Sequence, residues 1–235
     1  MYIYGKNVSR ERINSNEAIE RAYVSKKFRD QEIINLLKKK KVRINFVDDI
    51  VLNKKVDGNH QGIILEVDDA KTLTLNEFFP IIEGKKNPVV VMLDHLEDPH
   101  NFGAIIRTCE ALGVDGIIIP NDRSVGVNGT VVKTSAGAIV HVNIVRVANL
   151  TSTITKLKEH SFWVVGTDMN GTNYTELDYD IPICLVIGNE GHGMSKIVRD
   201  NCDFIAMIPM SGKINSLNAS VSSAIVLSKI MEKRS

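Results

Sequence analysis

Three polar segments in the second half of the chain combine residue types that could do chemistry. The first spans residues 94–110 and places Asn101, Arg107 and Glu110 on a loop and on the helix that it opens. Residues three or four positions apart in a helix lie on the same face. One face of this helix therefore carries Gly103, Arg107 and Glu110. Such a polar trio beside a strand end indicates a site for a polar ligand. The alternative is a capping asparagine and a surface Arg–Glu pair.

The second segment, residues 188–193, is a glycine-rich loop. It reads Gly-Asn-Glu-Gly-His-Gly, with three glycines in six residues. Glycines let a ligand approach bare backbone, and the helix that follows offers unpaired N–H groups. The loop lacks both the GxGxxG pattern and the Lys-Ser/Thr of a phosphate-binding loop. It therefore gives poor support to a dinucleotide site of the Rossmann type.

The third segment, residues 208–222, leads from a strand through a glycine-containing turn into a helix. Five of the eight residues from 215 to 222 are Ser or Asn. One such residue suffices to cap a helix, and the others weaken its first turns. The excess favours a hydrogen-bonding surface for a polar ligand. A serine-rich first turn that packs closely is the alternative.

The elements around these segments alternate regularly after Pro88. Short apolar runs such as residues 89–93 are typical of strands buried on both faces. Strands are expected at residues 89–93, 116–120, 140–145, 162–167, 183–187 and 204–208, with helices between them and a last helix at 217–232. This alternation predicts a parallel sheet covered by helices on both faces. Ligands of such sheets bind at the carboxyl ends of the strands, where the three polar segments begin.

The first part of the chain, residues 1–75, has the sequence pattern of a small α/β domain. Its helices are expected at residues 17–28 and 30–39, and its strands at residues 42–47 and 62–67. Residues 76–87 contain Pro80 and Gly84 and are expected to form a linker. Residues 88–235 then make the second, larger domain.

Charge is distributed unevenly, although the net charge is only +1. Residues 1–86 carry 17 Lys and Arg against 13 Asp and Glu, and the remaining residues carry 12 against 15. The lysines at residues 26–27 and 38–41 could contact phosphate, since nucleic-acid affinity begins with cationic side chains. They could equally be solvated helix faces, so charge alone does not decide whether the front of the chain meets RNA.

Composition excludes several classes of protein. No apolar run reaches the roughly 18 residues that cross a bilayer, and the N-terminus lacks the apolar core of a secretory signal. The three cysteines have no CxxC spacing, and the six histidines are scattered. We therefore expect a cytoplasmic protein with reduced thiols, no membrane span and no metal site.

Taken in this order and spacing, the three segments resemble the SpoU, or TrmH-type, family of RNA ribose 2′-O-methyltransferases over about residues 87–235. The front of the chain, at residues 4–8 and 60–63, is similar to the small substrate-binding domain of the ribosomal-RNA branch. That branch includes enzymes that act on guanosine in 23S rRNA. Two departures are Ala219, where valine is common, and Cys109, where alanine is common. We expect the first to affect packing more than chemistry.

The resemblance implies a fold and a reaction. The fold is an α/β parallel sheet whose C-terminal part is threaded into a deep trefoil knot, a rare exception among proteins. A small α/β RNA substrate-binding domain precedes it, and members form homodimers with each site near the dimer interface. The reaction moves a methyl group from S-adenosyl-L-methionine to a ribose 2′-hydroxyl of RNA, here expected to be a guanosine of 23S rRNA. No metal is required, because the sulfonium makes the methyl group electrophilic.

The resemblance also assigns residues by motif. The polar positions expected in catalysis are Asn101, Arg107, Glu190, Ser216 and Asn218. The positions expected to hold the cofactor, largely through backbone groups, are Thr167, Gly188, Asn189, Gly191, Ile208, Met210 and Leu217. Glu190 is expected to hold Asn101 or the glycine-rich loop in place. The other neutral polar positions are expected to orient the ribose, its phosphate and the cofactor carboxylate.

The energy needed to deprotonate an arginine decides which role we expect for Arg107. An arginine is often proposed in this family as the base that removes the hydroxyl proton. The arginine pKa lies above about 12, so a neutral arginine at pH 7 costs roughly 7 kcal/mol. A cationic Arg107 that binds the target phosphate and stabilises a developing alkoxide carries no comparable cost. We therefore expect an electrostatic role for Arg107.

Three other functions remain open. A transfer-RNA or resistance-type rRNA methyltransferase would share the motifs, although tRNA-specific members usually lack this kind of N-terminal domain. A non-catalytic RNA-binding relative would not need all five polar positions. A nucleotide-dependent metabolic enzyme would bind NAD instead of S-adenosylmethionine. The methylated nucleotide is not named by the sequence, because RNA is read through its folded shape.

Overall fold

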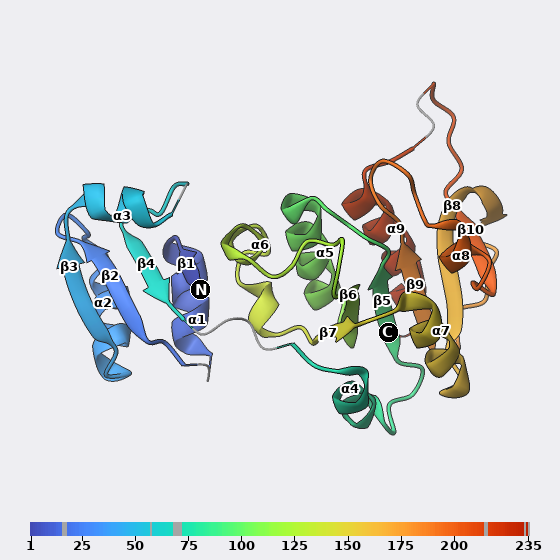
Figure 1. The fold of residues 1–235 in the computed structure, drawn as a ribbon, viewed down its shortest axis with the longest axis horizontal. Coiled ribbons are helices and arrows are strands. Elements are labelled where there is room, and N and C mark those ends of the chain that lie inside the picture. The colour runs from blue at the N-terminus through green and yellow to red at the C-terminus, as the bar shows by residue number, and fades with distance from the viewer. Residues whose placement is uncertain (16–17, 57, 68–71, 214–215, 233, 235) are drawn as a thin grey trace. The chain divides into compact units, whose positions relative to one another are not determined.

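The chain folds into two compact units in the computed structural model, which describes residues 1–15, 18–56, 58–67, 72–213, 216–232 and 234. The small unit comprises residues 1–71 and 127–140, and the large unit comprises residues 72–126 and 141–235 (Figure 1). The segment 127–140 therefore belongs with the front of the chain, although the sequence places it inside the second domain.

The small unit contains a four-stranded mixed sheet in the order β1-β4-β2-β3. β2 runs parallel to β3 and antiparallel to β4, and β4 is antiparallel to β1. The strands are β1 (Tyr2–Tyr4), β2 (Arg21–Ser25), β3 (Arg43–Val47) and β4 (Ile63–Glu66). The helices are α1 (Lys6–Asn14), α2 (Gln31–Lys39), α3 (Asp49–Lys55) and α6 (Gly129–Thr134), with a 3-10 turn η1 at Ala138–Val140.

The helix expected at residues 17–28 is wrong where the structure describes it, since Arg21–Ser25 form the strand β2. Residue 17 lies outside the described residues. β2 lies between β4 and β3, and its consecutive residues Tyr23 and Val24, which point to opposite faces of the sheet, are both buried. Burial on both faces of a central strand overrides the local helical pattern. The helix expected at 30–39 is confirmed as α2, which Asp30 caps by accepting from the Ile33 amide at 3.4 Å.

The large unit contains a six-stranded sheet in the order β10-β8-β9-β5-β6-β7, and every pair in it is parallel. The strands are β5 (Val89–Leu93), β6 (Gly116–Pro120), β7 (Ile144–Val147), β8 (Trp163–Asn173), β9 (Ile183–Ile187) and β10 (Phe204–Met207). The α/β class and the parallel sheet are thus as expected. The strand expected at 140–145 begins later, because residues 138–140 form η1.

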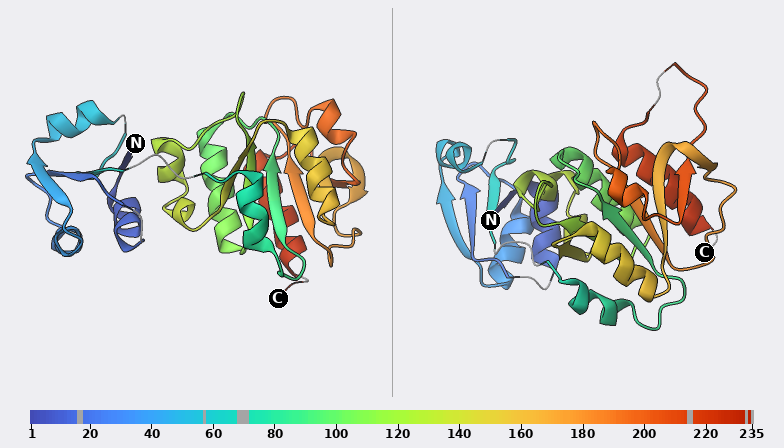
Figure 2. Two further views of the ribbon diagram at one scale, coloured as in Figure 1. Left: turned by 60° about the horizontal axis from the view of Figure 1, so that its bottom comes forward. Right: turned by 45° about the vertical axis from the view of Figure 1, so that its right-hand side comes forward.

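Helices cover both faces of this sheet (Figure 2). They are α4 (Leu75–Ile82), α5 (Pro99–Ala111), α7 (Leu150–Glu159), α8 (Lys196–Arg199) and α9 (Ala219–Glu232). α4, α7 and α8 share one apolar core with the sheet, whereas α5 and α9 pack against each other. No described helix is long and apolar enough to span a membrane.

The segment 76–87, expected to be a linker, contains most of helix α4. Thr74 and Glu77 form a capping box, in which each side chain binds the other residue's backbone amide. Leu75, Phe78 and Ile82 are buried in the core of the large unit. Pro80 and the following glycine suggest a loop locally, but the capping box and the apolar spacing of this segment are helix signals.

The trefoil knot stays a prediction of the resemblance. It depends on the path of the chain between β10 and α9, and residues 214–215 of that connection lie outside the described residues. The strands and helices on either side of this connection are those that the sequence predicts.

Candidate active site

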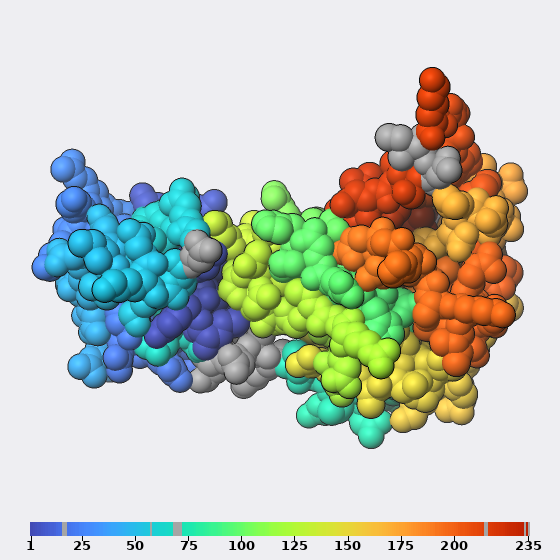
Figure 3. Space-filling model, turned by 45° about the horizontal axis from the view of Figure 1, so that its top comes forward, coloured from blue at the N-terminus to red at the C-terminus, as the bar shows by residue number. Residues whose placement is uncertain are grey.

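The carboxyl ends of β5 and β9 bring the first two polar segments together. Leu93 and Ile187, the last residues of these strands, are register partners in the parallel ladder. Because parallel strands end at the same edge of a sheet, the loops that follow them are neighbours. The space-filling view shows the loop 188–195 in orange beside the green segment 94–101 (Figure 3).

Helix α5 begins at Pro99. Asp98 caps the helix by accepting from the His100 amide at 2.8 Å, and Pro99 occupies the first helical position, which tolerates proline. Asn101 therefore lies inside the first turn and does not cap it. Its side chain is available for other partners, and the residue is only 7% exposed.

Three side chains, one from each polar segment, form a hydrogen-bonded chain. Asn101 donates from Nδ2 to Oε1 of Glu190 at 3.0 Å. Asn218 donates from Nδ2 to Oδ1 of Asn101 at 2.8 Å. These contacts join residues that are 89 and 117 positions apart in the sequence. The three segments thus meet in one site.

The orientation of each amide in this chain is fixed by its neighbours. Oδ1 of Asn218 accepts from the amide and the hydroxyl of Ser220, at 2.9 and 2.6 Å, and so caps the start of α9. The amide nitrogen of Asn218 must then point at Asn101. Oδ1 of Asn101 accepts that bond, which leaves its Nδ2 to donate to Glu190.

Glu190 fastens the glycine-rich loop to the start of α5. Besides Asn101, its carboxylate accepts from the amide of Asp98 at 3.2 Å and from the amide of Glu97 at 3.4 Å. Both carboxylate oxygens are engaged in these contacts. The expectation that Glu190 holds Asn101 in place therefore agrees with its geometry.

The glycine-rich loop is closed by its own contacts. Oδ1 of Asn189 accepts from the amides of Gly191 and His192 at 2.8 and 3.3 Å, and its Nδ2 donates to the carbonyl of His95 at 2.8 Å. A Cβ atom on Gly188 would lie 2.3 Å from the backbone of Gly193. The absence of a side chain at Gly188 is thus required by the fold of the loop itself.

Asp94 is a site residue that the sequence motifs did not single out. It is 1% exposed, and its two carboxylate oxygens lie 2.6 Å from the amide of Ser195 and 2.6 Å from Nδ1 of His95. It therefore ties the end of β5 to the residue that precedes α8. An acidic residue placed directly after a fully apolar strand was the available signal.

Thr167 lies where β8 departs from regular pairing. The register between β8 and β10 shifts between Ile205 and Ala206, so that residues 167–171 bulge out of the ladder. Thr167 is half-buried and donates to the carbonyl of Val186 at 3.1 Å. This bond places it beside the strand that leads into the glycine-rich loop.

The remaining cofactor positions lie on the connection between β10 and α9. Ile208 is half-buried, and the side chains of Met210 and Leu217 are 41% and 38% exposed. Ser216 is exposed and, within the described residues, makes no hydrogen bond to Asn101, Glu190 or Asn218. The structure thus joins the three polar segments at one edge of the sheet but leaves Ser216 outside the hydrogen-bonded chain.

Arg107 is exposed on α5. Among the described residues its guanidinium makes no hydrogen bond or ion pair, and the pair with Glu110 considered from the sequence is not formed. A free guanidinium can take an anionic partner from solution. Cys109, two residues further on, is fully buried, and burial raises the pKa of its thiol, so it is no nucleophile at neutral pH.

Thiols and metal ligands are the remaining groups that could do chemistry. All three cysteines are free thiols, and burial raises the pKa of Cys202 to about 12. Within the part of the chain that the structure describes, no cluster of three or more His, Cys, Asp or Glu side chains could hold a metal ion. The hydrogen-bonded chain Asn218–Asn101–Glu190 is built from two amides and a carboxylate.

Comparison with known proteins decides the family. The SpoU rRNA Methylase family matches residues 88–228, which include every expected site residue. The chain belongs to the SpoU family of RNA methyltransferases. The RNA 2′-O ribose methyltransferase substrate binding family matches residues 2–73, which cover most of the small unit.

Relatives within the SpoU family match almost the whole chain. A protein of Bacillus subtilis named as the TrmH family tRNA/rRNA methyltransferase YacO is 39% identical over 99% of this chain and 96% of its own length. A TrmH family tRNA/rRNA methyltransferase of Staphylococcus haemolyticus is 41% identical over 99% and 95%. RNA is therefore the class of molecule on which this SpoU family member acts.

Solved SpoU structures share the fold. The SpoU methyltransferase AviRb from Streptomyces viridochromogenes, solved in complex with the cofactor AdoMet, has a TM-score of 0.84 at 22% identity and covers 100% of this chain and 90% of its own. An AdoMet-bound rRNA methyltransferase from Sinorhizobium meliloti has a TM-score of 0.81 at 23% identity, covering 99% and 87%. At this identity the likeness shows the fold.

Proposed function

We propose that this SpoU family member transfers a methyl group from S-adenosyl-L-methionine to a ribose 2′-hydroxyl, with a guanosine of 23S rRNA as its target. The observation that carries the proposal is the hydrogen-bonded chain Asn218–Asn101–Glu190, which joins the three motif segments at the edge where ligands of parallel sheets bind. We further propose that the protein acts as a cytoplasmic homodimer, as the family resemblance implies.

The residues at this edge suit the proposed cofactor. S-adenosylmethionine combines an adenine ring, a ribose and a zwitterionic amino acid, so it needs hydrogen-bonding groups beside apolar surface. The exposed side chains of Met210 and Leu217 offer apolar surface, and the loop 188–193 offers backbone groups. When bound, the sulfonium supplies an electrophilic methyl group.

Alignment is the main task left to the protein. A reacting oxygen must be held in line with the methyl group, and positioned groups gain their effect by avoiding reorganisation during the reaction. The amides of Asn101 and Asn218 are held at fixed orientations by hydrogen bonds on both sides. We assign Glu190 to positioning, because its two oxygens already accept three hydrogen bonds.

Arg107 supplies positive charge. Its exposed guanidinium is free of partners among the described residues, so a phosphate of the RNA can bind it without displacing an internal ion pair. A cation near the ribose also stabilises the negative charge that develops on the 2′-oxygen as it attacks the methyl group and its proton passes to solvent water. The proposed role is thus an electrostatic clamp.

The test is a map of ribose methylation by mass spectrometry in rRNA and tRNA from cells with and without the gene. The expected result is the loss of one 2′-O-methylguanosine from 23S rRNA, restored by the wild-type gene. Loss of a mark from tRNA instead would favour the second candidate, a tRNA methyltransferase, which the tRNA/rRNA names of the relatives keep open. An unchanged map in both RNAs would overturn the proposal.

A further inference from the structure

One face of the small sheet carries a row of polar side chains that crosses all four strands. Residues that are register partners point to the same face of a sheet. Tyr2 pairs with Glu66, Glu66 pairs with Arg21, and Arg21 pairs with Arg43. The four side chains therefore stand side by side across β1, β4, β2 and β3, and we call them the Arg21 row.

Helix α3 covers the neighbouring row of the same face. There Tyr4, Ile64 and Tyr23 are buried together with Leu52 of α3. The Arg21 row lies beyond this cover, since Tyr2 and Glu66 are half-buried, the Arg21 side chain is 38% exposed and Arg43 is exposed. A polar row is thus presented to solvent beside a packed core.

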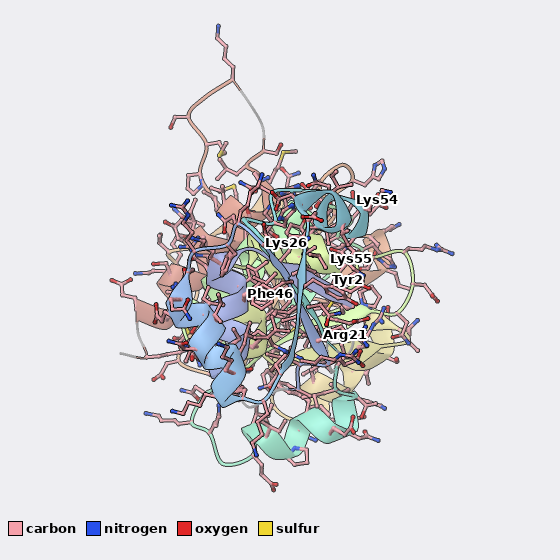
Figure 4. All side chains as sticks on the ribbon, turned by 90° about the vertical axis from the view of Figure 1, so that its left-hand side faces the viewer. Tyr2, Arg21, Lys26, Phe46, Lys54 and Lys55 are labelled. Atoms are coloured by element: carbon pink, nitrogen blue, oxygen red, sulfur yellow. The ribbon has the colours of Figure 1, made fainter. Side chains whose placement is uncertain are left out.

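Lys55, the last residue of α3, extends the row. Its ammonium donates to the hydroxyl of Tyr2 at 3.0 Å and lies 4.0 Å from the ring centroid of Tyr23. The hydrogen bond to Tyr2 raises the pKa of Lys55, so the side chain stays cationic at neutral pH. Figure 4 shows Lys54, Lys55, Tyr2 and Arg21 along the same side of the small unit.

Positive charge exceeds negative charge along this row. Glu66 is the carboxylate of the row, and it accepts from the hydroxyl of Tyr23 at 3.0 Å and lies 3.8 Å from Nε of Arg21. Arg43 stands beside Arg21 and has no ion pair within the described residues. Like charges placed opposite each other on a sheet cost stability, and a bound polyanion removes that cost.

The lysines that stood out in the sequence are organised differently. Lys26 is paired with Asp48 at 3.0 Å, which offsets its charge. Lys38, Lys39 and Lys41 are exposed at the end of α2, which is not among the elements that bury the Arg21 side of the sheet. Exposed lysines lose more conformational entropy on binding than side chains that are already held in place, as those of Arg21 and Lys55 are.

We propose that the Arg21 row, with Lys55, binds the sugar-phosphate backbone of the RNA substrate. This inference rests on the proposed function. It concerns phosphates and not stacked bases, because the ring of Tyr23 is buried and Lys55 lies over the rings of both Tyr2 and Tyr23. Arginines match phosphate oxygens with paired donors, and the Lys55 ammonium has donors beyond the one that Tyr2 takes.

The test uses the full-length enzyme and rRNA purified from cells that lack the gene, so that the target is unmethylated. Arg43→Gln is the main variant, because Arg43 is exposed and unpaired, and its folding is checked by thermal denaturation. Removing one phosphate contact should raise the KM for RNA about fivefold and lower the salt slope of binding by about 1. The kcat and the KM for S-adenosylmethionine should stay unchanged.

A matched variant and a conservative variant sharpen the test. Arg29→Gln removes the same charge from an exposed arginine between β2 and α2, outside the Arg21 row, and should leave the KM for RNA within about twofold of wild type. Tyr2→Phe keeps the ring but removes the hydroxyl that holds Lys55. It should raise the KM for RNA by a smaller factor than Arg43→Gln does.

Each outcome separates this inference from the function on which it rests. If Arg43→Gln and Arg29→Gln behave alike while the wild-type enzyme methylates its RNA, the Arg21 row is not the binding face, and the proposed function stands. An increase in KM with an unchanged salt slope would overturn backbone contact by Arg43. A wild-type enzyme that methylates neither rRNA nor tRNA would overturn the proposed function itself.

Discussion

Asn218 donates a hydrogen bond to Asn101 at 2.8 Å across 117 residues of sequence. Asn218 also caps α9, and Asn101 in turn donates a hydrogen bond to Glu190. The start of α9, the start of α5 and the glycine-rich loop are thus joined by side chains. Substitutions along this chain should be non-additive, because each removes contacts that the others share.

Asn101→Asp should reduce kcat about 100-fold at pH 8, since it replaces the donor 3.0 Å from Glu190 by a second carboxylate oxygen. One proton shared between the two carboxyls restores a donor, so the deficit relative to wild type should shrink as the pH falls to about 5.5. The pH–rate profiles of both enzymes measure this. Asn14→Asp, an exposed change in α1, is the control, and a deficit that does not vary with pH would contradict the pairing.

Glu190→Gln keeps an oxygen acceptor for Asn101 and for the amide of Asp98, but it turns an NH₂ group toward the backbone amide of Glu97. We expect a loss of roughly 1–2 kcal/mol in the free energy of unfolding and about a tenfold fall in kcat, with an unchanged pH optimum. Urea denaturation and a pH–rate profile test this, with the exposed Glu159→Gln as control. A displaced pH optimum would give Glu190 a role in proton transfer.

Arg107→Lys keeps the positive charge but loses the planar pair of donors. As a clamp, Arg107 should tolerate this change poorly, and kcat should fall with no shift of the apparent pKa in the pH–rate profile. Arg29→Lys in the small unit serves as the matched control. A wild-type rate combined with a shifted pKa would show that Arg107 acts as the base.

Asp94→Asn should loosen the glycine-rich loop. It places a donor against the amide of Ser195 or the ring of His95, both of which now meet a carboxylate oxygen at 2.6 Å. We expect the free energy of unfolding to fall by about 1–3 kcal/mol and the KM for S-adenosylmethionine to rise more than kcat falls. The exposed Asp122→Asn is the control. An unchanged KM with a reduced kcat would place Asp94 in the chemistry instead.

Local signals were enough to predict the large sheet and the segments that carry the site. The apolar run at residues 89–93 became the central strand β5, and the polar residues after it did lie at the edge of the sheet. Asp30 and the periodic apolar residues after it became α2. These features follow from neighbours in the sequence, which is why the sequence sufficed.

Features that depend on distant partners could not be predicted. β2 is a strand because it pairs with β3 and β4 on its two sides. No local pattern within residues 21–25 predicts that pairing. The same holds for Asn101, whose partners come from positions 89 and 117 residues away. Helix α4 is different, since the capping box of Thr74 and Glu77 is a local helix signal that prevails over Pro80.

The long separations within the Asn218–Asn101–Glu190 chain also bear on the order of folding. Closing a long loop costs entropy before its contacts form, so contacts of high sequence separation are late events. Helices α5 and α9 can each form from local hydrogen bonds, yet the capping of α9 and the orientation of Asn101 are coupled only when both have docked. On refolding, helical circular dichroism should therefore recover before methyltransferase activity does.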